Sequence, residues 1–336
     1  MTPALYARSE PFETGTLPVS DGALLAWECS GNPTGIPAVH LHGGPGGGRG
    51  RRGFIRTFDP MRYRVVAYDQ RGCGASTPHV EEDPGRAGHT LPRYIGDLEE
   101  LREHLGIEAW VLYGVSWGST LALAYAQAHP ERVLAVSLMA VTTTSAHEVA
   151  WVSEGVGRLY PEAHAQLVEV LRNQPEGYRP GEEHLVAALD RLMGSSDATV
   201  REAVAGAWML WEDHHLAIGA GGFQPSLSLW PRKAQVGFTM LVSRLWRDVA
   251  FGAAGGPGPA ELLHKAHLLP RVPAHLVHGR LDVSGPVETA WHLYRDWPGS
   301  ELVVIEDEGH GGPLMAQAVT DFHDRLSGSG AVVRPS

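Results

Sequence analysis

Ser116 lies between two glycines in the stretch YGVSWGST, residues 113–120, and it is the first candidate for covalent chemistry. An apolar run precedes Gly114, and a stretch rich in alanine and leucine follows Gly118. A strand, a tight turn and a helix in this order expose a nucleophilic serine at the carboxyl edge of a sheet. A plain turn serine is the alternative, because the spacing G-x-S-x-G alone is a weak signal. The flanking strand and helix favour the nucleophile.

A serine hydroxyl needs a base to act as a nucleophile at neutral pH, and the base needs a carboxylate to orient it. Among the histidines after Ser116, His310 stands out because it follows a strand in the glycine-containing loop EDEGHGG. Such a loop can place an imidazole over the edge of the sheet. We therefore predict His310 as the base, with an ordinary loop histidine as the alternative.

Asp282 is the predicted orienting carboxylate. It ends the strand-like stretch LVHGRLD, and open α/β sheets collect their functional groups at the carboxyl ends of strands. Its alternative role is to cap the helix that begins near Pro286. The three acidic residues at 306–308 are rivals, but they are too close to His310 in sequence to come from a separate strand end.

Acyl transfer also needs donors for a developing oxyanion, and backbone amides are suited to this task. The turn around Ser116 directs the Trp117 amide there, and a second donor is expected from a glycine-rich loop after an early strand. The stretch HLHGGPGGG, residues 40–48, occupies such a place. A phosphate-binding loop is the alternative, but the Lys-Ser/Thr ending of one such loop and the G-x-G-x-x-G spacing of another are both missing.

The elements that must position these residues alternate between strand and helix, which is the signature of an α/β sheet. The predicted strands are 23–29, 38–43, 64–70, 110–115, 133–140, 274–282 and 301–310. The predicted helices are 91–106, 120–130, 286–297 and 314–326. The later strands of the first half are apolar on both faces, which indicates parallel strands covered by helices on each side.

Residues 142–265 interrupt the alternation, because they give helical segments such as 182–193 and 200–216 without clear strands. We therefore predict a core domain from residues 1–141 and 266–330, an inserted helical cap domain at 142–265, and a flexible tail at 331–336. The stretch 251–261, rich in glycine and proline, is interpreted as the loop where the chain returns to the core.

Charge and cysteine content narrow the possible partners. The formal net charge is −11, with 38 acidic and 27 basic residues, and it argues against binding to nucleic acid or to an anionic membrane. The short basic cluster RGRR at 49–52 is interpreted as a solvated loop. Two cysteines, Cys29 and Cys73, cannot form the disulfide framework of a small secreted protein. No signal-like or membrane-spanning apolar run occurs, so we expect a cytoplasmic protein.

Four stretches occur in an order and at distances that are typical of one enzyme family. They are HGGPGGG (42–48), DQRGCGAS (69–76), GVSWGSTLALAYAQAHPERV (114–133) and HGRLDVSGPVETAWHLYRDWP (278–298). Together they resemble the proline iminopeptidases, which are aminopeptidases with the α/β-hydrolase fold, a mostly parallel sheet with helices on both faces, and an inserted helical cap. The resemblance implies Ser116 as nucleophile, Asp282 and His310 as its partners, and the amides of Gly44 and Trp117 as the oxyanion hole.

The resemblance also points to residues of the cap. Members of the family hold the free amino end of the substrate with cap glutamates, one of which follows a tryptophan, and Trp211 and Glu212 match this place. A partly buried carboxylate can bind a cationic amine through a charge-assisted hydrogen bond. A solvated helix carboxylate is the alternative. The family's second glutamate, in a segment like ENHYF, is missing, and residues 213–260 contain only Asp213 and Asp248 as acids, so Asp248 is a candidate substitute.

These residues lead to the hypothesis of a serine aminopeptidase without cofactor or metal. It would release an amino-terminal residue, preferably proline, from short peptides. An esterase or amidase with the same triad but no need for a free amine is the second hypothesis, because the second cap glutamate is missing. A small-molecule binding protein without useful turnover is the third, and the sequence gives it no support because all three triad positions are filled. The oligomeric state is left open.

Overall fold

The computed structural model describes residues 5–50, 53–83, 88–220, 222–223, 225–252 and 262–328. Most of the predicted return loop at 251–261 and all of the predicted tail at 331–336 lie outside these described residues.

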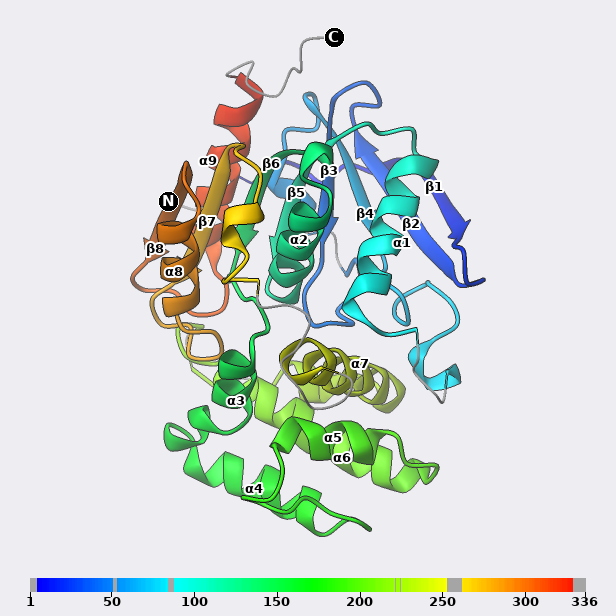
Figure 1. Ribbon diagram of the computed structural model, residues 1–336, viewed down its shortest axis with the longest axis vertical. Coiled ribbons are helices and arrows are strands. Elements are labelled where there is room, and N and C mark those ends of the chain that lie inside the picture. The colour runs from blue at the N-terminus through cyan, green and yellow to red at the C-terminus, as the bar shows by residue number, and fades with distance from the viewer. Residues whose placement is uncertain are drawn as a thin grey trace.

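One sheet of eight strands runs through the described part of the chain (Figure 1). Its strands are β1 (Pro11–Pro18), β2 (Leu24–Gly31), β3 (Ile36–Leu41), β4 (Tyr63–Tyr68), β5 (Trp110–Val115), β6 (Val133–Met139), β7 (Ala274–Gly279) and β8 (Ser300–Ile305). They lie in the order β1-β2-β4-β3-β5-β6-β7-β8. β2 pairs antiparallel with β1 and with β4, and all pairs from β4 to β8 are parallel. The predicted mostly parallel sheet is confirmed.

The strand β1 was not among the predicted strands. Its sequence, PFETGTLP, contains two prolines and a glycine, and most of its side chains are exposed or half-buried. An edge strand needs no strong apolar alternation, and proline is tolerated there because only one side of the strand is paired. The signal that reveals a buried strand is therefore missing from its sequence.

Helices cover both faces of the sheet, as predicted. On one face lie α1 (Leu91–His104), α2 (Trp117–Ala128) and α8 (Glu288–Asp296), and on the other lies α9 (Pro313–Gly328). The strand β5 shows the result of this arrangement. Its side chains Trp110 and Leu112 belong to the apolar cluster of the first face, whereas Val111 and Tyr113 belong to the cluster under α9. A strand buried on both sides has no polar face, which explains its continuous apolar sequence.

Five helices follow β6 before the chain returns to β7. They are α3 (Ala146–Ser153), α4 (Pro161–Arg172), α5 (Leu185–Met193), α6 (Ala198–His215) and α7 (Arg232–Phe251). Figure 1 shows them gathered at one end of the molecule, below the sheet. We call them the helical layer. Its helices pack around an apolar cluster of their own, which includes Leu189, Trp208 and Leu241, while Leu245 and Val249 of α7 join the core cluster on the α1 side.

The turn from β5 to α2 depends on a very close approach of backbones. Ser116 has φ 56° and ψ −125°, and its N–H donates to the Met139 carbonyl at 2.9 Å. A Cβ added to Gly118 would lie 1.9 Å from the Leu41 carbonyl oxygen of β3. One added to Gly114 would lie 2.4 Å from the Gly118 oxygen. Both positions therefore require glycine, and together they hold Ser116 at the carboxyl edge of the sheet.

Replacing Gly118 by alanine should lower the free energy of unfolding by roughly 3 kcal/mol, because the new methyl group would collide with the backbone of a central strand. The shift of the urea midpoint measures this effect. Gly96→Ala is the matched control: Gly96 lies in α1 with open space around its Cβ position. That change should stabilise the protein slightly, by up to about 1 kcal/mol. Equal midpoints for Gly118→Ala and the unchanged protein would contradict the tight approach.

Candidate active site

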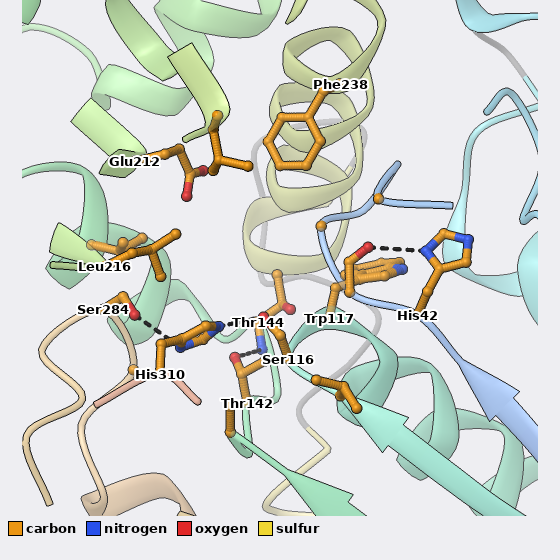
Figure 2. A pocket seen from close by; sticks show the side chains of 18 of the residues that line it. His42, Ser116, Trp117, Thr142, Thr144, Glu212, Leu216, Phe238, Ser284 and His310 are labelled. Atoms are coloured by element: carbon orange, nitrogen blue, oxygen red, sulfur yellow. Dashed lines mark hydrogen bonds between the residues drawn. The ribbon is translucent and has the colours of Figure 1, made fainter. Parts of the chain in front are cut away.

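A cavity of about 460 Å³ lies between the carboxyl edge of the sheet and the helical layer. The core contributes the glycine-rich loop after β3, the turn at Ser116, and loops that carry Ser284 and His310. The helical layer contributes the end of α6 and one side of α7 (Figure 2). Much of the wall is apolar, with side chains that include Val149, Val152, Leu216, Leu227, Trp230, Phe238 and Trp246.

The structure brings Ser116, His310 and Asp282 into one chain of hydrogen bonds. Ser116 Oγ lies 2.9 Å from Nε2 of His310, and Nδ1 of His310 lies 2.8 Å from Oδ2 of Asp282. The three residues follow β5, β8 and β7, which are parallel, so their carboxyl ends meet at one edge of the sheet. With the proton on Nδ1, the imidazole accepts the Ser116 hydroxyl proton and can remove it during attack.

The opposite charges of Asp282 and protonated His310 stabilise each other. Burial alone would raise the pKa of Asp282, but the charge of His310 and the hydrogen bond with it hold that pKa well below its usual range. Burial disfavours protonation of His310, yet the charge of Asp282, the hydrogen bond with it and the field of Glu212 raise the pKa of His310 above 6.5. Asp282 therefore stays ionised, and His310 is a stronger base than a free imidazole.

Ser284 contacts both Asp282 and His310. Its place in the sequence, two residues after Asp282, does not indicate this role. Its hydroxyl donates to Oδ1 of Asp282 at 2.6 Å, and its Oγ lies 3.0 Å from Nδ1 of His310. The backbone amides of Ser284 and Gly285 donate to the same carboxylate oxygen, each at 3.1 Å. Both oxygens of Asp282 are thus occupied, which fixes the plane of the carboxylate.

The rival carboxylates at 306–308 lie elsewhere. Glu308 is buried and accepts the backbone amides of Leu314 and Met315 at the start of α9, so it caps that helix. Glu306 is exposed and pairs with Arg280 at 3.0 Å. Neither contact involves His310.

Gly44 and Trp117, the two predicted amide donors, both line the cavity beside Ser116. A side-chain network holds their loops together. The Trp117 indole N–H donates to Oε1 of Gln70 at 3.0 Å, and Nε2 of Gln70 donates to the His42 carbonyl at 2.9 Å. The backbone N–H of Gln70 also donates to Nε2 of the His42 imidazole, at 3.1 Å. Gln70, a polar residue just after the buried strand β4, thus ties the glycine-rich loop to the start of α2.

The helical layer places Glu212 in the cavity wall. Glu212 is 7% exposed and faces Ser116 and His310 across the cavity (Figure 2). Its Oε2 lies 3.3 Å from Nε2 of His215, which also lines the cavity. Trp211 is buried in the helical layer, where its indole N–H donates to the Val152 carbonyl at 3.0 Å. Asp248 is buried on α7 but is not among the described residues that line the cavity.

Among the residues that the structure describes, no group of three or more His, Cys, Asp or Glu side chains could hold a metal ion. In the same part of the chain, no helix combines the length and apolar character needed to cross a membrane.

Comparisons with known proteins agree with the four sequence motifs. A family model described as the alpha/beta hydrolase fold matches residues 39–314. A "Probable proline iminopeptidase" of Streptomyces coelicolor is 41% identical over 308 residues, which cover 91% of this chain and 92% of the relative. The proline iminopeptidase of Arabidopsis thaliana is 37% identical over 309 residues, 91% of this chain and 77% of the relative.

A solved structure, the proline iminopeptidase of Mycobacterium smegmatis, superposes with a TM-score of 0.61 at 18% identity and covers 95% of this chain and 100% of that chain. At this level of identity the likeness concerns the fold alone. Together with the family model, it confirms the predicted α/β-hydrolase fold.

The raised pKa of His310 predicts the acid limb of a pH profile. His310 must be neutral to accept a proton, so kcat/KM for a short acyl ester should fall as the pH drops through a value above 6.5. Glu212→Gln removes a negative field that raises this pKa, and the limb should move to lower pH. The exposed Glu306→Gln variant is the control and should leave the limb in place. Identical limbs in all three proteins would show that the field of Glu212 does not reach His310.

Proposed function

Because the chain belongs to the proline iminopeptidase family of α/β-hydrolase fold enzymes, we propose that it releases an amino-terminal residue, preferably proline, from short peptides. The observation that carries this proposal is the hydrogen-bonded chain from Ser116 through His310 to Asp282 at the floor of a cavity. Family membership makes the protein a hydrolase, and the three hydrogen-bonded residues supply the groups that hydrolysis of an amide requires.

The proposed reaction forms an acyl-enzyme. Ser116 Oγ attacks the scissile carbonyl carbon while His310 Nε2 takes the hydroxyl proton, and the amides of Gly44 and Trp117 stabilise the oxyanion. The C–N bond then breaks, and His310 gives its proton to the leaving amine. A water molecule deprotonated by His310 attacks the carbonyl carbon of the Ser116 ester, the Oγ–acyl bond breaks, and His310 returns the proton to Ser116 Oγ. The amino acid leaves as a carboxylic acid, which ionises in solution. Asp282 stays ionised throughout and stabilises the imidazolium.

Glu212 is proposed to bind the free amino group of the substrate. It is buried, it faces Ser116 and His310, and its negative charge suits a cationic amine. An amine-blocked peptide would leave this carboxylate buried without its partner, which costs binding free energy. The apolar walls suit a proline ring, and the helical layer over the cavity leaves room for short peptides only. This role also accords with the predicted cap domain at 142–265.

A second candidate, an esterase or amidase without an amine requirement, is favoured by one observation. The side of α7 that faces the cavity offers Phe238 and Trp246, whereas Asp248 is not among the described lining residues. Amine recognition then depends on Glu212, because Glu148, the other carboxylate in the described lining, already accepts several hydrogen bonds from the protein. Cytoplasmic location stays part of the first proposal, since Cys29 and Cys73 are both buried free thiols, as suits a reducing compartment.

Hydrolysis of proline arylamide, alanine arylamide, an amine-blocked proline arylamide and a short acyl ester tests the proposal. The free-amine proline substrate should be cleaved fastest, and Ser116→Ala should lower kcat at least about 1,000-fold because the nucleophile is lost. Glu212→Gln should raise KM for the proline arylamide about 10- to 100-fold, with a smaller effect on the ester.

Faster cleavage of the ester than of the free-amine proline substrate, or indifference to blocking of the amine, would support the second candidate instead. A wild-type rate that survives Ser116→Ala would refute the acyl-enzyme mechanism. Labelling of Ser116 by a fluorophosphonate in the wild-type protein provides an independent measure of its reactivity.

A further inference from the structure

His215 is a buried polar side chain in the cavity wall that no step of the proposed reaction uses. It lies three residues after Glu212 on α6, so both side chains project from the same side of the helix. His215 is 3% exposed and lines the cavity. Neither of its ring nitrogens makes a hydrogen bond among the described residues, although Nε2 lies 3.3 Å from Oε2 of Glu212. Buried polar groups nearly always have a partner, so an imidazole left without one at a cavity wall is placed to meet a ligand.

The position of Glu212 shows which part of a substrate would reach His215. Glu212 faces Ser116 and His310, and its field contributes to the raised pKa of His310. The free amine of an amino-terminal residue is bonded to the carbon next to the scissile carbonyl, about 2.5 Å from the carbonyl carbon by standard bond lengths and angles. An amine held at Oε2 of Glu212 is then close to Nε2 of His215, because these two atoms are 3.3 Å apart.

Other ionisable groups around the cavity are already engaged. Glu148 of α3 lines the cavity, but its carboxylate accepts hydrogen bonds from Thr142, Thr143, Ser145 and Thr289. Arg49 lies 3.1 Å from both Glu28 and Asp69. Among the residues of the neighbouring helices, His164 of α4 packs on Trp211 with its Nε2 toward the Ser153 carbonyl, Asp190 of α5 pairs with Arg247 of α7, and Asp213 of α6 accepts the amides of residues 226–228.

We propose that His215 is the second polar contact of the substrate's free amine and sets the preference for a secondary amine; this inference rests on the proposed aminopeptidase function. A protonated proline amine has two N–H groups. One donates to the Glu212 carboxylate, and the other donates to the neutral imidazole of His215. A primary ammonium has three N–H groups, so the same site leaves one of them without a protein partner.

Kinetics of two His215 variants test the proposal, with the proline arylamide, the alanine arylamide and the short acyl ester as substrates. His215→Phe should raise KM for the proline arylamide at least tenfold, reduce the preference for proline over alanine, and change kcat less than KM. His215→Gln keeps an acceptor oxygen for the amine, so it should recover most of the affinity and of the proline preference. His214→Ala is the matched control: the neighbouring residue faces the Leu210 carbonyl of its own helix, and KM should not change.

The outcomes separate this inference from the proposed function. If the wild-type enzyme does not cleave free-amine arylamides through Ser116, the proposed function fails and this inference fails with it. If it does cleave them, and His215→Phe retains the wild-type KM and proline preference, only this inference is overturned. Fluorophosphonate labelling of Ser116 and the circular dichroism spectrum identify a variant that has misfolded. In that case His215→Leu takes the place of His215→Phe, and a wild-type KM and proline preference in the folded variant contradict the role of His215.

Discussion

The site depends on the close approach of α2 to β3. The Cβ position of Gly118 is occupied by the Leu41 carbonyl oxygen, so no larger residue fits between helix and strand. This contact allows the chain to turn at Ser116 in a conformation with positive φ that serine rarely adopts. The hydroxyl is then presented above the sheet instead of being turned into the helix. The strain at one residue is balanced by the buried packing on both sides of β5.

The remaining polar groups of the site are positioned by the parallel order of the strands. Asp282 and His310 follow two neighbouring strands, β7 and β8, and reach Ser116 across the end of β6. Gln70, at the end of β4, ties the glycine-rich loop after β3 to Trp117. Each functional side chain comes from a different strand end, but all these ends lie on one edge. The helical layer then adds a largely apolar wall, and apolar surroundings strengthen the electrostatic interactions inside the cavity.

Much of this arrangement could be predicted from the sequence, because its signals are local. The strand, the glycines and the helix around Ser116 are consecutive, and Asp282 and His310 each follow a strand. Residues whose partners are distant in sequence could not be found in this way. Gln70 acts through hydrogen bonds to His42 and Trp117 that no spacing reveals, and the contact of Ser284 with His310 is equally hidden. The strand β1 is an edge strand with little apolar pattern. Asp248 is a carboxylate and therefore matches the expected second cap acid by residue type, whereas His215 is of another type and only the structure places it beside Glu212.

The replacement of a second carboxylate by an imidazole changes the electrostatics of the whole cavity. Two carboxylates side by side repel each other, and one of them tends to bind a proton, which removes the charge that attracts the amine. A neutral imidazole next to Glu212 avoids this repulsion and still offers a hydrogen-bond acceptor. A second negative charge would also raise the pKa of His310 further and push the neutral, active form of the base to higher pH. The pair of Glu212 and His215 therefore suits a cation while limiting the cost to the base that must act beside it.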